Sequence, residues 1–169
     1  MTRTTARELA VLITASMASG REDAETVLDR FFEPEHYATL AMEGPQFAEP
    51  PDEKQLAYIR SLVSLTAEHR EELDAHIERC AHGWKAERLS RAAGAILRCA
   101  LCEILYFPDV PDASAIDAAV DIAKKYEGEE GPAFVNGVLG GFMRARTGAD
   151  TADMPADTGA PTDTGETEV

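Results

Sequence analysis

The feature that most constrains the fold is a succession of apolar stretches with helical periodicity, separated by glycine and proline. In the clearest stretch, Ile116, Ala119, Val120 and Ala123 follow the i, i+3, i+4, i+7 spacing of one helix face. No segment sustains the period-two alternation of a half-buried strand. The pattern therefore predicts an all-α, single-domain bundle of about seven helices, in which short connections favour antiparallel neighbours.

Helix boundaries are expected where capping residues and prolines meet the periodic stretches. Asp52, Ser90 and Ser114 are candidate N-caps. Pro34 is expected to end the second helix, whereas Pro132 suits the first turn of the last one. The expected helices span residues 6–19, 24–32, 52–66, 66–84, 90–105, 114–126 and 132–146. The sequence leaves open whether the third and fourth are joined.

The charge of the chain is strongly negative and unevenly distributed. The 169 residues include 16 basic and 31 acidic ones, giving a formal net charge of −15. Residues 147–169 hold six of the acidic residues, no Lys or Arg, and almost no large apolar side chain. Such a segment cannot bury enough surface to offset its ordering entropy. We therefore expect a helical domain over residues 1–146 and an acidic disordered tail over 147–169.

An acidic protein repels a phosphate backbone, so any nucleic acid must bind at a local basic patch. Residues 1–84 contain eight basic and sixteen acidic groups, whereas residues 85–146 contain eight and nine, which favours the second half. The basic residues singled out there are Lys85, Arg88, Arg91, Arg98, Lys124 and Lys125. The last two end a helix, where positive charge also favours the helix dipole.

Two residues near the start of the last helix suit single-stranded RNA. Phe134 could stack on a base and Asn136 could hydrogen-bond one, which is how such RNA is read. The alternative is that Phe134 belongs to the core and Asn136 caps or bridges helices.

Other chemistries have weaker support. Cys99 and Cys102 lie inside an apolar helix and are expected to be small buried hydrophobes rather than a zinc or redox pair. No nucleophile–base arrangement and no glycine-rich phosphate loop is visible, so neither an enzyme, a cofactor nor a metal site is predicted. No apolar run approaches a membrane span and no signal pattern is seen, so a cytoplasmic location is expected.

Several motifs, in matching order and spacing, resemble the NusB family of transcription antitermination factors. They lie at residues 6–10, 96–105, 108–111, 116–126 and 134–139. The resemblance implies an all-helical fold and binding of boxA-type RNA together with NusE, a small-subunit ribosomal protein. It further implies a role in the RNA polymerase antitermination complex, which promotes ribosomal RNA transcription.

The resemblance also implies roles for individual residues. The candidate RNA-binding residues are Arg3, Arg7, Lys124, Lys125, Phe134 and Asn136. The candidate residues for the protein partner's face are Glu103, Glu129 and Glu130.

The chain departs from the family pattern where positive charge is expected. Thr4 and Thr5 lie between Arg3 and Arg7 in place of a denser arginine cluster, and Ala133 replaces a lysine. Each lost cation removes a phosphate contact, so we expect weak RNA binding by the free protein. Two alternatives stay open: a protein-interaction module of the same fold that has lost RNA binding, and a detached NusB-like domain of an RNA methyltransferase.

Overall fold

The computed structural model describes residues 1–148, and over that range the chain forms eight α-helices and two short 3-10 turns. The first four helices are α1 (Arg3–Ser16), α2 (Ala24–Phe31), α3 (Pro34–Glu43) and α4 (Glu53–Glu68). The last four are α5 (Arg70–Cys80), α6 (Arg91–Tyr106), α7 (Asp112–Tyr126) and α8 (Gly131–Thr147). The turns are η1 (Pro45–Phe47) and η2 (Ala86–Arg88). The predicted all-α class is confirmed, with one helix more than expected.

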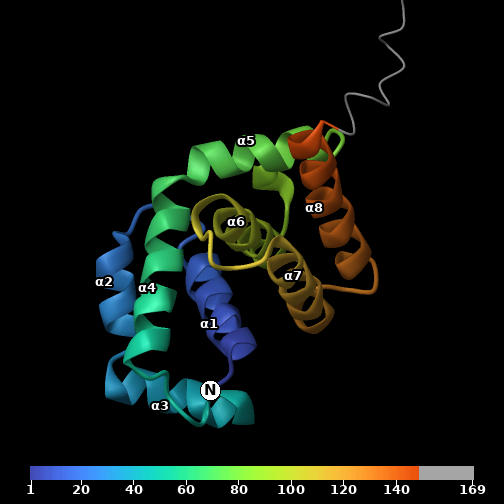
Figure 1. Ribbon diagram of the computed structural model, residues 1–169. Helices are drawn as coiled ribbons and strands as arrows, with labels where there is room; N and C mark the ends of the chain where they lie inside the picture. The colour runs from blue at the N-terminus through green and yellow to red at the C-terminus, as the bar shows by residue number, and fades with distance from the viewer. Residues whose placement is uncertain (149–169) are drawn as a thin grey trace, which may run out of the picture.

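Helix α6 lies at the centre of the bundle. It packs against α1, α4, α5, α7 and α8. Figure 1 shows α2 and α4 on one side of α1 and α6, with α7 and α8 on the other and α5 crossing one end. Twelve of the 16 residues of α6 are buried, so this helix has almost no solvent face.

The core is aliphatic and draws on nearly every helix. Its largest fully buried apolar side chains are Leu9, Ile13, Leu28, Ile59, Leu62, Leu73, Ile77, Ile96, Leu97, Leu101 and Leu139. Because burying each such side chain is worth roughly 1.5–3 kcal/mol, this shared core is the main force that holds the helices together.

Two of the predicted N-caps are confirmed. Asp52 accepts a hydrogen bond from the Gln55 backbone N–H at 2.8 Å, and the Gln55 side chain accepts one from the Asp52 N–H at 3.1 Å. This reciprocal capping box fixes the start of α4. Ser90 accepts a hydrogen bond from the Ala93 N–H at 3.0 Å and starts α6.

One helix was missed and one other N-cap prediction is wrong. Helix α2 ends at Phe31, within one residue of the expected end, but Pro34 occupies the first turn of α3, a helix that was not predicted. Ser114 is not the cap of α7, because that helix begins at Asp112, directly after Pro111.

The boundary between α4 and α5 lies at His69, so these helices are not joined. His69 has φ −100° and ψ 18°, which ends α4 and turns the chain into α5. Helix α5 then ends at Cys80, which leaves Trp84 in the following loop.

The last helix passes the predicted domain boundary by one residue. Thr147 is the final residue of α8, and Gly148 follows it with φ 84°, the left-handed conformation that suits glycine at a helix end. The remainder of the predicted acidic tail lies outside the described residues.

Over residues 1–148, none of the helices combines the length and the apolar character that a bilayer crossing requires.

We predict that Leu97→Ala, at a fully buried position of α6, lowers the free energy of unfolding by about 2–5 kcal/mol, since it leaves a cavity against several helices. Urea denaturation followed by circular dichroism measures the change. Met42→Ala is the matched control, because Met42 is 88% exposed and its truncation should change stability by about 0.5 kcal/mol or less. Similar losses for the two variants would contradict a core centred on α6.

Candidate nucleic-acid interface

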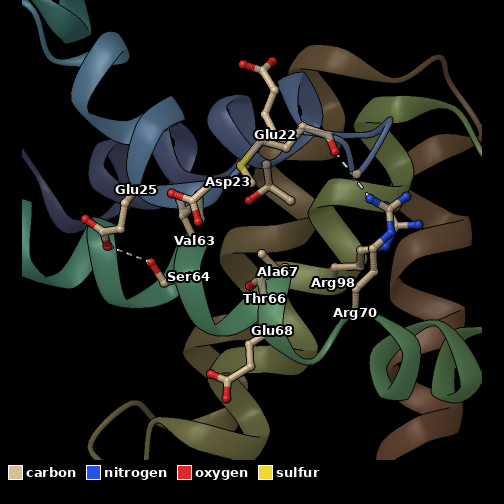
Figure 2. Close-up of a pocket in the computed structure, with 14 residues that line it drawn as sticks. Glu22, Asp23, Glu25, Val63, Ser64, Thr66, Ala67, Glu68, Arg70 and Arg98 are labelled. Carbon is tan, nitrogen blue, oxygen red and sulfur yellow. Dashed lines mark hydrogen bonds between the residues drawn. The ribbon is translucent and has the colours of Figure 1, made fainter.

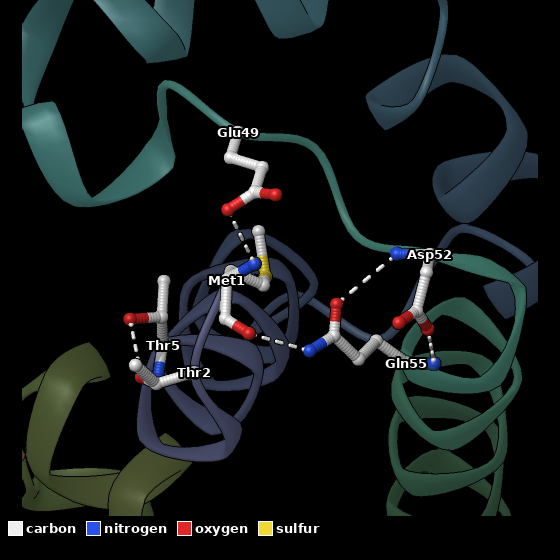
Figure 3. A network of polar contacts seen from close by, with 6 residues as sticks. All are labelled: Met1, Thr2, Thr5, Glu49, Asp52 and Gln55. Carbon is white, nitrogen blue, oxygen red and sulfur yellow. Dashed lines mark hydrogen bonds and ion pairs between the residues drawn. The ribbon is translucent and has the colours of Figure 1, made fainter.

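The residues before α1 are held against the start of α4. The Met1 ammonium group lies 3.1 Å from a carboxylate oxygen of Glu49, and the Gln55 side chain donates a 2.6 Å hydrogen bond to the Met1 carbonyl. Thr2 caps α1 by accepting from the Thr5 N–H at 3.1 Å. Figure 3 shows how these contacts tie the N-terminus to the loop that precedes α4.

Arg3 is exposed at this anchored end. Its guanidinium carbon lies 4.6 Å from the centroid of the Tyr58 ring, a cation–π contact. Arg3 also lines a hollow of about 610 Å³, together with Lys54 and Phe107. Of the two predicted N-terminal arginines, Arg3 is therefore the one whose charge faces solvent.

Arg7 is instead buried in an ion pair with Glu103. The Arg7 Nε lies 3.0 and 3.1 Å from the two carboxylate oxygens, and the two side chains are 10% and 3% exposed. The Tyr58 hydroxyl donates a 2.8 Å hydrogen bond to the same carboxylate. Burial and the Glu103 charge raise the pKa of Tyr58, which keeps its proton on the oxygen. Arg7, which was predicted to contact RNA, and Glu103, which was predicted to contact the partner protein, thus meet in one buried cluster.

Lys125 is half-exposed and paired with a buried carboxylate. Its Nζ lies 2.8 Å from Glu8, which is 1% exposed. The Tyr126 hydroxyl donates a 2.6 Å hydrogen bond to the other Glu8 oxygen, and burial together with that bond raises the pKa of Tyr126. Glu8 was not predicted as a site residue. The available signal was its place beside Arg7 on α1, because two adjacent and opposite charges are both buried in the bundle.

Four more predicted residues lie where α7 ends and α8 begins. Lys124 is exposed and pairs with Asp121 at 3.4 Å, a surface contact of little energetic weight. Glu129 and Glu130 are exposed in the turn before α8, and Asn136 is exposed on α8 itself. The structure therefore brings these residues to one corner of the molecule.

Phe134 joins this corner from a half-buried position. It packs against the core on one side and lies edge-on to Trp84 on the other, with ring centroids 6.4 Å apart and an interplanar angle of 71°. The two rings and Glu130 line a hollow of about 250 Å³. Trp84 was not predicted as a site residue, although it is the only tryptophan of the chain and precedes a lysine.

A third hollow, between α1, α2 and α4, has the wrong charge for RNA. Its volume is about 490 Å³, and its rim carries the carboxylates of Glu22, Asp23, Glu25 and Glu68. Figure 2 shows Arg70 and Arg98 on one wall of it. Arg98 lies 2.6 Å from Asp74, and Arg70 donates a 2.9 Å hydrogen bond to the Ala18 carbonyl. With these cations engaged, the acidic rim repels phosphate.

Two cysteines are held as thiols. Cys99 and Cys102 are buried on α6, and burial raises the pKa of Cys99 to about 12 and that of Cys102 to about 11. Because the thiolate is the form that attacks or binds metals, these groups are chemically quiet at neutral pH. Within residues 1–148, no cluster of three or more His, Cys, Asp or Glu is arranged to hold a metal ion.

Sequence comparison places the chain in a family. A profile of the NusB family matches residues 4–144, so the chain belongs to that family. It is 36% identical to the transcription antitermination protein NusB of Symbiobacterium thermophilum, over 90% of this chain and 96% of that relative. It is 39% identical to the protein of the same name in Carboxydothermus hydrogenoformans, over 83% of this chain and 91% of the relative.

Solved structures share the fold. NusB of T. maritima superimposes with a TM-score of 0.71 at 24% identity, covering 91% of this chain and 99% of that one. A crystal structure of NusB and NusE in complex with dsRNA gives a TM-score of 0.66 at 24% identity, covering 86% and 99%. At this level of identity, the likeness shows the fold alone.

We predict that Arg7→Met lowers the free energy of unfolding by about 3–5 kcal/mol, because it leaves the Glu103 carboxylate buried without its cation. The double variant Arg7→Met with Glu103→Leu should recover most of that loss, since it removes both charges. Urea denaturation of the two variants measures the difference. An Arg7→Met variant as stable as the parent would show that the guanidinium is not required by the fold.

Proposed function

We propose that the chain is a transcription antitermination factor that binds boxA-type RNA together with NusE and promotes ribosomal RNA transcription. The observation that carries this proposal is the family match over residues 4–144. The relative from Symbiobacterium is matched over 96% of its own length, so the likeness is to an entire antitermination protein. The chain acts by binding, within the RNA polymerase antitermination complex in the cytoplasm, and not by catalysis.

The corner between α7 and α8 supports this function through its chemistry. Lys124 and Lys125 carry exposed or half-exposed charge there, and Phe134 and Asn136 offer a ring and an amide. An aromatic face with nearby cations and an amide is the combination that reads single-stranded RNA. Arg3 adds a solvent-facing charge at the anchored N-terminus.

This interface carries little free positive charge, so the proposal requires NusE to contribute to RNA binding. Arg7 is occupied by Glu103, and Lys125 is partly neutralised by Glu8. Few cations at this corner therefore remain for phosphates, so NusE is expected to supply further contacts there. The same observation favours the second candidate, a NusB-fold interaction module that no longer binds RNA.

We predict weak binding of boxA RNA by the free chain and tighter binding once NusE is added. Because the free chain neutralises few phosphates, the logarithm of its RNA association constant should fall only shallowly with the logarithm of salt concentration. Addition of NusE should make this slope steeper. Titration of labelled RNA at two salt concentrations, with and without NusE, measures both effects.

A scrambled RNA of equal length is the control for that titration. Equal affinity for boxA and scrambled RNA in the presence of NusE would overturn the antitermination proposal. Binding of NusE without any RNA binding would instead establish the interaction module.

A further inference from the structure

The loop between α5 and α6 presents a tryptophan to solvent. Trp84 is 54% exposed, although a large ring of this kind is usually covered. The turn before it is tight, with His82 at φ 47° and Gly83 at φ 98°, and it directs the chain away from the end of α5. The Trp84 backbone N–H then bonds to the Ala81 carbonyl at 3.4 Å, which ties the turn to the end of the helix.

Three cations follow Trp84 closely in the chain, and one of them, Arg88, lines the same hollow. Lys85, Arg88 and Arg91 are all exposed. Among the residues that the structure describes, none of these three side chains forms an ion pair or a hydrogen bond. By contrast, Arg7, Arg98 and Lys125 all have carboxylate partners. The loop therefore holds uncommitted positive charge on a protein that is acidic as a whole.

The nearby carboxylates are largely engaged within the protein. Glu127 accepts a 2.8 Å hydrogen bond from the Ser90 hydroxyl. Glu78 accepts one from the Ala86 N–H at 3.1 Å, which holds η2 in place. Glu130 is the exposed carboxylate at the rim of the hollow. Glu78 and Glu127 keep their charge, but each has an oxygen committed to an internal donor, whereas Lys85, Arg88 and Arg91 face solvent.

We propose that Trp84, Lys85, Arg88, Arg91 and Phe134 form a second RNA-contacting surface, here called the Trp84 surface, for single-stranded RNA. A base stacks on Trp84 beside the Phe134 ring, and the three cations neutralise the adjoining phosphates. This proposal rests on the proposed function and extends its interface from α8 onto the loop before α6.

The geometry favours a base as the occupant. The hollow between the rings is about 250 Å³, below the roughly 300–1,000 Å³ of small-molecule pockets, and it is open on the Trp84 side. Phe134 fixes one wall because it is packed on the core. An aromatic ring flanked by lysine and arginine is the sequence-tolerant platform on which single-stranded nucleic acids stack. The three cations would attract any anionic ligand, and the exposed Trp84 ring favours single-stranded RNA among them, because a base stacks on the ring.

The single tryptophan makes the test direct. Trp84 is the only tryptophan in the chain, so its fluorescence reports on this surface alone. We expect boxA RNA, titrated into the full chain with NusE present, to quench this fluorescence with the same midpoint as labelled-RNA binding. A tryptophan-free or separately corrected NusE keeps the signal specific.

Variants test the energetic role of the surface. Trp84→Ala should weaken RNA binding by about 5-fold or more, the size of one base-stacking contact, and Trp84→Phe should restore much of it. Replacing Lys85, Arg88 and Arg91 with alanine should reduce the salt slope by about 2, as expected for three lost phosphate contacts to a single strand. Arg21→Ala and Met42→Ala are matched controls, an exposed cation and an exposed apolar residue elsewhere.

The outcomes separate this proposal from the function on which it rests. Absence of RNA binding by the parent chain with NusE would overturn both. Normal binding by the parent, with unchanged fluorescence and an unaffected Trp84→Ala variant, would overturn the Trp84 surface alone. A Trp84→Ala variant that loses NusE affinity in the absence of RNA, but binds RNA normally, would assign the surface to the protein partner and overturn the proposal.

Discussion

The burial of α6 on nearly all sides is the constraint on which the rest of the structure depends. A helix in that position can be almost wholly apolar, yet α6 carries Arg98 and Glu103, which are both buried. Unpaired charges there would be prohibitively costly, so each requires a partner from a neighbouring helix. Asp74 of α5 meets Arg98 and Arg7 of α1 meets Glu103, and these pairs set how two helices lie on the central one.

The same requirement shapes the functional surface. Glu8 enters the bundle beside Arg7 and draws Lys125 of α7 toward it. Adjacent residues of α1 therefore hold opposite charges against two different helices. As a result, Arg7 is committed to an internal ion pair, and Lys125 is only partly available to a phosphate group. Among the cations near the proposed RNA surfaces in residues 1–148, Arg3 at one end and Lys85, Arg88 and Arg91 at the other have no carboxylate partner.

Much of the helical framework was predictable because its signals are local. The capping box at Asp52 and the Ser90 cap depend on residues three apart, and the structure confirms both. The errors in helix boundaries lie at prolines, because the local sequence does not show whether a proline ends one helix or begins the next. Pro34 begins α3, and only the packing of that helix against α2 and η1 resolves the choice.

The candidate site was predictable in part. Phe134, Asn136 and the two lysines are close in sequence, so their shared corner follows from two consecutive helices. Trp84 lies 50 positions before Phe134, and no local pattern joins them. Likewise, the exposure of Arg7 could not be inferred, because its partner Glu103 lies 96 residues away.

The sequence by itself determined the helices, the family and the uneven charge, since these follow from periodicity, motif spacing and composition. The tertiary structure alone decided which charges are available. Burial converts Arg7 from a candidate RNA contact into half of an internal ion pair, and it leaves Lys85, Arg88 and Arg91 unpaired among the described residues. The physical reason is that the energy of a charge depends on its solvent exposure and on partners that folding brings from distant positions.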